Sequence, residues 1–189
     1  MSKILAFAGS LRRESFNRKA LRIATDGARA TGAEVTLLEL ADLPLPLFDE
    51  DTEAREGLHP NARKLKDLMI AHQGFLVACP EYNSSITPLL KNALDWASRA
   101  DGSEAGGLPY RNKVVGLVAA SAGMLGGLRG LRHVREIFGN LGCTVLPEQY
   151  ALSRADAAFD EQGSLRDEKT RKALHNVGAR LAAVVADWK

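Results

Sequence analysis

The sequence predicts an α/β fold with one doubly wound, five-stranded parallel sheet in the order 2-1-3-4-5 and helices on both faces. Along all 189 residues, short apolar runs alternate with longer segments of helical apolar spacing. This is the pattern of a parallel sheet joined by crossover helices. Three of the runs are apolar throughout, as expected for strands covered on both faces. For five strands joined by right-handed crossovers, 2-1-3-4-5 is a common order.

The first half of the chain is predicted to supply three strands and two helices. Residues 3–8 (KILAFA) and 74–79 (GFLVAC) are apolar throughout and predict buried strands. Residues 34–40 (EVTLLEL) alternate more and predict a strand with one wetter face. Residues 15–31 and 60–71 carry apolar side chains at helical spacing, so each predicts a helix that crosses over between strands.

The second half continues the alternation. Residues 87–99 predict a helix with Pro88 in its first turn, where a missing N–H costs nothing. Residues 113–120 (KVVGLVAA) predict the third fully buried strand, and residues 125–141 the next helix. A strand over residues 143–150 and a closing helix over residues 167–188 complete the expected order.

Composition argues against several classes of protein. Hydrophobic residues make up 46% and charged residues 25%, and the net charge is only +2, which gives no support to nucleic-acid or membrane-surface binding. No apolar stretch approaches the ~18 residues of a membrane span, and the apolar N-terminal stretch is too short for a signal peptide. Cys79 and Cys143 are too few for a disulfide framework. We therefore expect a soluble cytoplasmic protein with one domain over residues 1–189.

Unusual loops follow the first, third and fourth predicted strands. The strand order is that of flavodoxin-like folds, in which ligands bind beyond the carboxyl ends of the strands where the order reverses. In the first loop Ser10, Ser15 and Asn17 surround a predicted helix start, and Arg12 adds a charge. This arrangement is typical of a phosphate cradle, although it is neither a Walker A loop nor a G-x-G-x-x-G turn. The alternative is that Ser15 is a helix N-cap beside solvated arginines.

The second loop, residues 80–88, places Glu81, Tyr82 and Asn83 directly after a buried strand. Such a turn offers hydrogen bonds beside a flat surface and would suit a planar heterocycle. The alternative is an ordinary strand-to-helix turn in which Thr87 caps the helix ahead of Pro88. The third loop, residues 121–127, contains three glycines, which permit a ligand to approach the backbone closely or merely make the turn flexible.

Other candidate groups are weaker. The four histidines have no metal-ligand spacing, and the acidic residues between Asp49 and Glu53 are expected as a solvated loop, so no metal is predicted. Ser10 lacks the G-x-S-x-G context of a hydrolase nucleophile. Both cysteines fall in predicted strands and are expected to be buried and inert. A helix carries Arg129, Arg132 and Arg135, which predict either a solvated face or a phosphate or subunit contact.

Taken together, the loops resemble those of the NADPH-dependent FMN reductase family, a flavodoxin-like group that includes chromate and quinone reductases. The resemblance extends to about Tyr150, and it departs from the family at Ser84, where a glycine often follows the Glu-Tyr-Asn triplet. The matching stretches are Gly9-Ser10-Leu11-Arg12 with Ser15-Phe16-Asn17, Leu45-Pro46-Leu47-Phe48, Pro80-Glu81-Tyr82-Asn83 with Pro88 to Trp96, and Ser121-Ala122-Gly123 with Gly126-Gly127.

The resemblance implies FMN as cofactor, NAD(P)H as hydride donor, quinone-like acceptors, and a homodimer or homotetramer. Because the flavin carries the hydride chemistry, it implies no catalytic side chain. The implied phosphate-binding residues are Ser10, Arg12, Ser15 and Asn17, with Phe16 between them in the cofactor site. The residues implied along the ribityl chain and ring are Pro80, Glu81, Tyr82, Asn83 and Ser84, and those implied to approach the ring from the third loop are Ser121 and Gly123.

Two other functions and one assembly are left open by the sequence. A flavodoxin-type electron carrier meets basic partners through acidic surfaces, which the net charge of +2 does not favour. An FMN-binding regulatory module would need an output domain, and we expect none beside this single domain. The long irregular stretch over residues 41–58 is expected to expose Leu45, Leu47 and Phe48, and exposed apolar clusters mark contact surfaces. We therefore expect a homo-oligomer with the flavin site beside a subunit interface.

Overall fold

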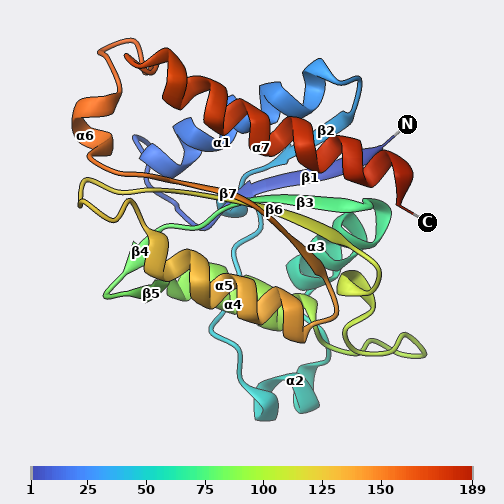
Figure 1. The fold of residues 1–189 in the computed structure, drawn as a ribbon. Helices are drawn as coiled ribbons and strands as arrows, with labels where there is room; N and C mark the ends of the chain where they lie inside the picture. The colour runs from blue at the N-terminus through green and yellow to red at the C-terminus, as the bar shows by residue number, and fades with distance from the viewer. Residues whose placement is uncertain (1, 189) are drawn as a thin grey trace.

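A five-stranded parallel sheet forms the centre of the protein, which is described over residues 2–188 by a computed structural model (Figure 1). The observed order is β2-β1-β3-β6-β7, so counting the five sheet strands along the chain gives the predicted 2-1-3-4-5. The fold is the flavodoxin-like one that the sequence predicts. The strands are β1 (Lys3–Ala8), β2 (Glu34–Leu38), β3 (Gly74–Ala78), β6 (Val114–Ala120) and β7 (Thr144–Leu152).

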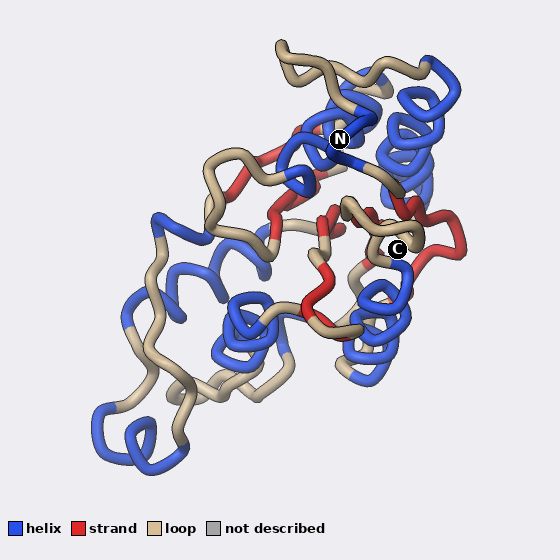
Figure 2. The backbone as a smooth tube through the Cα atoms, turned by 90° about the vertical axis from the view of Figure 1, so that its left-hand side faces the viewer, coloured by secondary structure: helices blue, strands red, loops and turns tan. Residues whose placement is uncertain are grey.

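Helices cover both faces of the sheet (Figures 1 and 2). Two of them, α1 (Phe16–Ala30) and α7 (Glu168–Asp187), lie together on one face, and α3 (Pro60–Ala71), α4 (Pro88–Ala97) and α5 (Leu128–Asn140) cover the other. Each face buries its own apolar cluster, which explains why β1, β3 and β6 are apolar on both sides. No helix within residues 2–188 has the length and apolarity to cross a bilayer.

Two glycines allow α1 and α7 to touch. A Cβ atom on Gly27 would lie 1.9 Å from the carbonyl oxygen of His175, and one on Gly178 would lie 1.7 Å from that of Ala24. Only glycine avoids both clashes, so the backbones of the two helices approach directly. This contact fixes α1, and therefore the loop that leads into it from β1, relative to the sheet.

The predicted irregular loop over residues 41–58 contains regular structure. A 3₁₀ turn (Leu40–Asp42) ends β2 early, and a short helix, α2 (Glu50–Glu56), follows. The side chain of Asp49 accepts hydrogen bonds from the N–H groups of Asp51 and Thr52. The acidic residues therefore cap and fill the first turn of α2, where negative charge favours a helix. Asp49, Glu50 and Asp51 are exposed to solvent, as expected, but the segment is a helix rather than a loop because these side chains stabilise its first turn.

Several shorter elements were also not predicted. The loop after β3 forms a hairpin of β4 (Glu81–Tyr82) and β5 (Ser85–Ile86), and a 3₁₀ turn (Leu108–Tyr110) and α6 (Ala155–Ala158) lie further along. Helix α5 begins at Leu128 rather than 125 because Gly126 and Gly127 both have positive φ, at 61° and 94°. A right-handed helix does not accommodate such residues.

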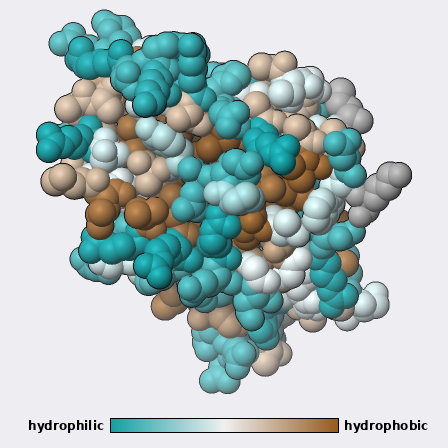
Figure 3. Space-filling view, in the orientation of Figure 1, coloured by the Kyte–Doolittle hydropathy of each residue, from teal (hydrophilic) through white to brown (hydrophobic). Residues whose placement is uncertain are grey.

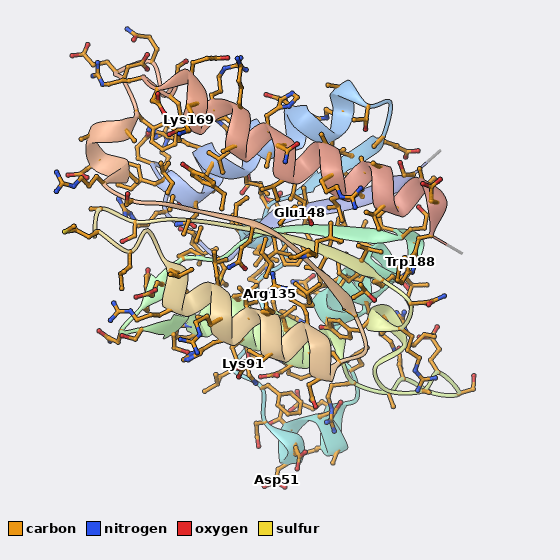
Figure 4. The ribbon with its side chains drawn as sticks, in the orientation of Figure 1. Asp51, Lys91, Arg135, Glu148, Lys169 and Trp188 are labelled. Atoms are coloured by element: carbon orange, nitrogen blue, oxygen red, sulfur yellow. The ribbon has the colours of Figure 1, made fainter. Side chains whose placement is uncertain are left out.

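Strand β7 forms one edge of the sheet, and its pairing with β6 is interrupted. The pairing of β6 with β7 shifts register between Val115 and Leu117, which leaves residues 146–148 as a bulge. Arg135 of α5 donates to the carbonyl oxygens of Val145 and Leu146, and Glu148 pairs with Arg180 of α7 at 3.1 Å (Figure 4). A bulged, charged edge resists pairing with another strand. Hydrophobic side chains show on the surface mainly between α7 and α5, beside this edge (Figure 3).

Candidate active site

The three loops singled out by the sequence meet at the carboxyl ends of β1, β3 and β6. The N–H of Gly9, after β1, donates to the carbonyl oxygen of Ala78 in β3 at 2.9 Å. The hydroxyl of Thr87, at the end of the second loop, donates to the carbonyl oxygen of Gly9 at 2.8 Å. The third loop begins directly after Ala120, the last residue of β6. The predicted convergence at the switch point between β1 and β3 is therefore what the structure shows.

Helix α1 begins at this point with an open N-terminus. Its N-cap residue Ser15 makes no side-chain capping hydrogen bond, and its first turn has no acidic residue. By contrast, the side chains of Asp49, Thr87 and Asp167 cap α2, α4 and α7. Ser15 therefore stands at the N-cap position, as the alternative expected, but its hydroxyl caps nothing. The N–H groups of the first turn of α1 and the helix dipole favour an anion at this point.

Arginine side chains flank this helix start. Arg12 is exposed, and within residues 2–188 its guanidinium makes no hydrogen bond or ion pair. Its backbone is held, because its N–H donates to Ser10 Oγ at 3.3 Å and its carbonyl oxygen accepts from Arg18 at 3.3 Å. A guanidinium on a fixed backbone beside open N–H groups can form a charge-assisted pair with a phosphate.

Asn17 lies in the same turn, but its side chain is engaged inside the protein. The residue is 5% exposed, and its carboxamide bonds both polar main-chain groups of Ala120, at 2.7 Å and 3.0 Å. Its backbone N–H remains in the open first turn of α1. Phe16, beside it, packs on Phe159 with the ring centroids 6.1 Å apart.

The second loop presents its hairpin to solvent. Tyr82 is 54% exposed, and the turn residues Asn83 and Ser84 both have positive φ, at 49° and 71°. Two successive residues with positive φ define the tight type I′ hairpin turn, which Asn accommodates well and Ser less well. A glycine at position 84 would meet this conformational demand without strain.

Glu81 holds the hairpin against α5. One carboxylate oxygen accepts the Gly130 N–H at 3.0 Å, and the other pairs with Arg129 at 2.7 Å. Glu81 therefore caps the N-terminal turn of α5 from a distance, which no short-range pattern could have predicted. Burial raises the pKa of the neighbouring Cys79 thiol to about 12, and the negative charge of Glu81 contributes to this rise. Cys79 is buried, as predicted, and its raised pKa favours the protonated thiol at neutral pH.

The third loop completes the site with glycines and exposed apolar side chains. The N–H of Gly123 donates to Ser121 Oγ at 3.1 Å, which closes a small turn. Met124 is 77% and Leu125 49% exposed, so the loop offers an apolar rim. A Cβ atom on Gly126 would lie 2.6 Å from the main chain of Leu152, which explains why a glycine stands there. This loop can therefore lie close to a ligand with one apolar face.

These features fit one kind of ligand. A phosphate fits the open end of α1, and a planar ring with hydrogen-bonding edges fits the hairpin and the apolar rim. Among described residues no group of three metal-ligating side chains comes together. The sequence model of one family, described as NADPH-dependent FMN reductase, matches residues 2–157. The chain belongs to the NADPH-dependent FMN reductase family.

Relatives and solved structures agree with this family. An NAD(P)H-dependent FMN reductase of Pseudomonas aeruginosa is 37% identical over 91% of this chain and 89% of its own. A quinone reductase of Pseudomonas putida is 35% identical over 98% of this chain and 97% of its own. The structure of the flavoenzyme NAD(P)H:(acceptor) oxidoreductase FerB of Paracoccus denitrificans superposes with a TM-score of 0.81, at 27% identity, covering 100% of this chain and 99% of the other.

Family membership confirms the resemblance that the loops suggested. It also confirms the predicted class of enzyme, an NAD(P)H-dependent oxidoreductase that uses FMN. The roles of individual residues in this FMN reductase depend on the site geometry described above.

Proposed function

We propose that this FMN reductase holds FMN at the switch point and passes reducing equivalents from NAD(P)H to quinones or similar small acceptors. The observation that carries the proposal is the open N-terminus of α1 in a member of this family: the side chain of Ser15 caps no N–H, and within residues 2–188 the guanidinium of Arg12 has no partner. The quinone reductase of Pseudomonas putida and its relatives support the choice of acceptor.

The proposal assigns the phosphate to the first loop. Ser10 and Ser15 offer hydroxyls, Arg12 offers the charge, and Phe16 and Asn17 offer backbone N–H groups of the open turn. Along the ribityl chain and ring we place the backbone of the second loop and the start of the third. Those residues are Pro80, Glu81, Tyr82, Asn83, Ser84, Ser121 and Gly123.

The side chains of this site bind and orient. When bound, FMN supplies the hydride-accepting chemistry. Glu81 ties the start of the second loop to α5, and Thr87 ties its end to Gly9, so both ends of this loop are anchored. Met124 and Leu125 give the open face an apolar edge that suits a nicotinamide or a quinone in turn. The proposal assigns no side chain to acid–base catalysis and calls for no metal.

Cofactor identity and turnover test the proposal directly. Heat-released cofactor, identified by chromatography, is expected to be FMN, and steady-state oxidation of NADPH is expected to depend on an added quinone. Recovery of FAD or failure of reconstitution with FMN would contradict the cofactor assignment. FMN binding without NADPH turnover would favour the electron carrier or the regulatory module.

A homo-oligomer is part of the proposal. The side chain of Leu47 is 81% exposed, although the backbone on both sides of it is fixed. Before it, Asn92 Nδ2 and Trp96 Nε1 each donate to the carbonyl oxygen of Pro46 at 2.8 Å. After it, the N–H of Phe48 donates to Asn92 Oδ1 at 2.8 Å. An apolar pocket of about 260 Å³ lies beside residues 45–48, which we call the strap. A fixed, exposed leucine next to an apolar pocket fits a two-fold contact. The lining residues are Leu11, Leu40, Ala41, Leu43, Pro44, Leu45, Leu89, Asn92 and Ala93.

Within this strap the sequence expectation was partly wrong. Leu45 and Phe48 are half-buried, because Phe48 packs edge-on against Trp96 with the ring centroids 5.1 Å apart and Arg99 lies over its ring. Only Leu47 of the three projects fully. The proposal also retains one FMN-binding domain over residues 1–189 and a cytoplasmic location, which two unpaired, buried cysteines suit.

A further inference from the structure

The main chain at the end of β6 has polar groups that the sheet leaves without a strand partner. The carbonyl oxygen of Val118 accepts from Cys79 on the β3 side, and the N–H of Ser121 donates to Leu152 on the β7 side. Because successive residues of a strand point their polar groups to opposite sides, Ala120 points toward β3. Strand β3 has already ended at Ala78, so no strand residue stands opposite Ala120.

The side chain of Asn17 takes the place of the missing strand residue. Its Nδ2 donates to Ala120 O at 2.7 Å, and its Oδ1 accepts the Ala120 N–H at 3.0 Å. A carboxamide offers the same donor and acceptor as a peptide group, so it extends the hydrogen bonding along the β3 side of β6 by one residue. The two residues are 103 positions apart, and both bonds are buried.

These two hydrogen bonds join the first and third loops of the proposed cofactor site. Asn17 is the second residue of α1, in the turn with the open N–H groups, and Ala120 is the last residue before the third loop. We propose that Asn17 is a positioning residue whose side chain holds the open turn of α1 against the end of β6 and thereby aims its N–H groups at the phosphate. This inference rests on the proposed function, because it needs a phosphate at that turn.

The same arrangement elsewhere in the chain supplies a matched control. Asn92 of α4 also accepts a main-chain N–H, from Phe48 at 2.8 Å, and donates to a main-chain carbonyl oxygen, that of Pro46, at 2.8 Å. It fastens the strap rather than α1. Asn92→Ala therefore removes the same two kinds of hydrogen bond as Asn17→Ala without touching the open turn.

The test compares FMN with riboflavin, which lacks the phosphate, by fluorescence titration of the flavin-free protein. Wild type is expected to prefer FMN. Asn17→Ala is expected to reduce that preference roughly tenfold, as for loss of about one charge-assisted hydrogen bond. Riboflavin affinity is expected to stay close to that of wild type, and Asn92→Ala is expected to keep the full preference. Asn17→Ser, which retains one hydrogen-bonding group, is expected to fall between and decides the matter if Asn17→Ala does not fold.

Three results would overturn the inference. Equal losses of FMN and riboflavin affinity in the Asn17 variants would make the residue merely structural, and unchanged affinities would remove its role altogether. If wild type binds no FMN, the proposed function fails and this inference falls with it. The first two results leave the wild-type preference for FMN intact, so the two failures are distinguishable.

Discussion

The hydroxyl of Thr87 joins two loops of the site: it donates to the carbonyl oxygen of Gly9 at 2.8 Å and accepts the N–H of Leu90 at 3.2 Å. The second bond is the N-cap that the alternative interpretation of this loop expected. The first ties the start of the proposed phosphate loop to α4, and Thr87 is only 2% exposed. One buried hydroxyl therefore both begins a helix and fixes a loop 78 residues away.

Thr87→Val is expected to destabilise the protein by about 2 to 3 kcal/mol, because it removes a helix cap and leaves the buried carbonyl of Gly9 unpaired. Thr87→Ser keeps the hydroxyl and is the control, with a loss of less than half that size. Urea unfolding of the flavin-free proteins measures both. Equal losses in the two variants would show that the methyl group, not the hydroxyl, matters.

Arg12→Ala is expected to weaken FMN binding roughly tenfold, because it removes a charge-assisted hydrogen bond to the phosphate. The neighbouring Arg13 is also exposed and is the natural control, since Arg13→Ala changes the net charge equally. Fluorescence titration gives both affinities. Equal weakening in the two variants would indicate general electrostatic attraction rather than a contact at Arg12.

Ser84→Gly is expected to stabilise the flavin-free protein by about 1 kcal/mol, because Ser84 has φ 71° in the hairpin turn and glycine adopts that conformation without strain. Ser84→Ala keeps the strain and serves as the comparison. Thermal unfolding at one pH reports both. A glycine variant no more stable than the alanine variant would show that the turn carries no such strain.

The two thiols are expected to resist a disulfide reagent at pH 8 in the folded protein and to react in denaturant. Burial raises the pKa of Cys79 and of Cys143 to about 12. Since the pKa is raised, the thiolate is the minor form below pH 12 and is on the order of one part in ten thousand at pH 8. Rapid titration of either thiol in the folded state would contradict the burial described here.

Leu47→Asp is expected to shift the protein from an oligomer toward a 20.4 kDa monomer in sedimentation at micromolar concentration, because a charge would enter the proposed apolar contact. Leu37→Asp is the control, since Leu37 is also exposed but lies on the edge strand β2. A wild-type monomer that still turns over NADPH would refute the interface while leaving the enzyme assignment intact.

Local patterns account for the fold. Continuous apolar runs such as residues 74–79 and 113–120 predict strands buried on both faces, and their alternation with helices predicts the sheet order. The order of apolar and polar residues within one segment is enough to predict whether that segment is buried. For the same reason the positions of the three site loops, which follow the strand ends, were predictable from the sequence.

Only the tertiary structure decided what individual polar side chains do. Glu81 and Asn17 both belong to segments for which the sequence predicted ligand contacts, yet Glu81 caps α5 and Asn17 completes the hydrogen-bond ladder of the sheet beside Ala120. Their partners lie 49 and 103 residues away. A polar side chain bonds whichever buried main-chain group the fold leaves unpaired, and that group is not identified until distant strands have met. The sequence by itself determined where the three loops would meet, and the packing of the sheet determined which residues hold them in shape.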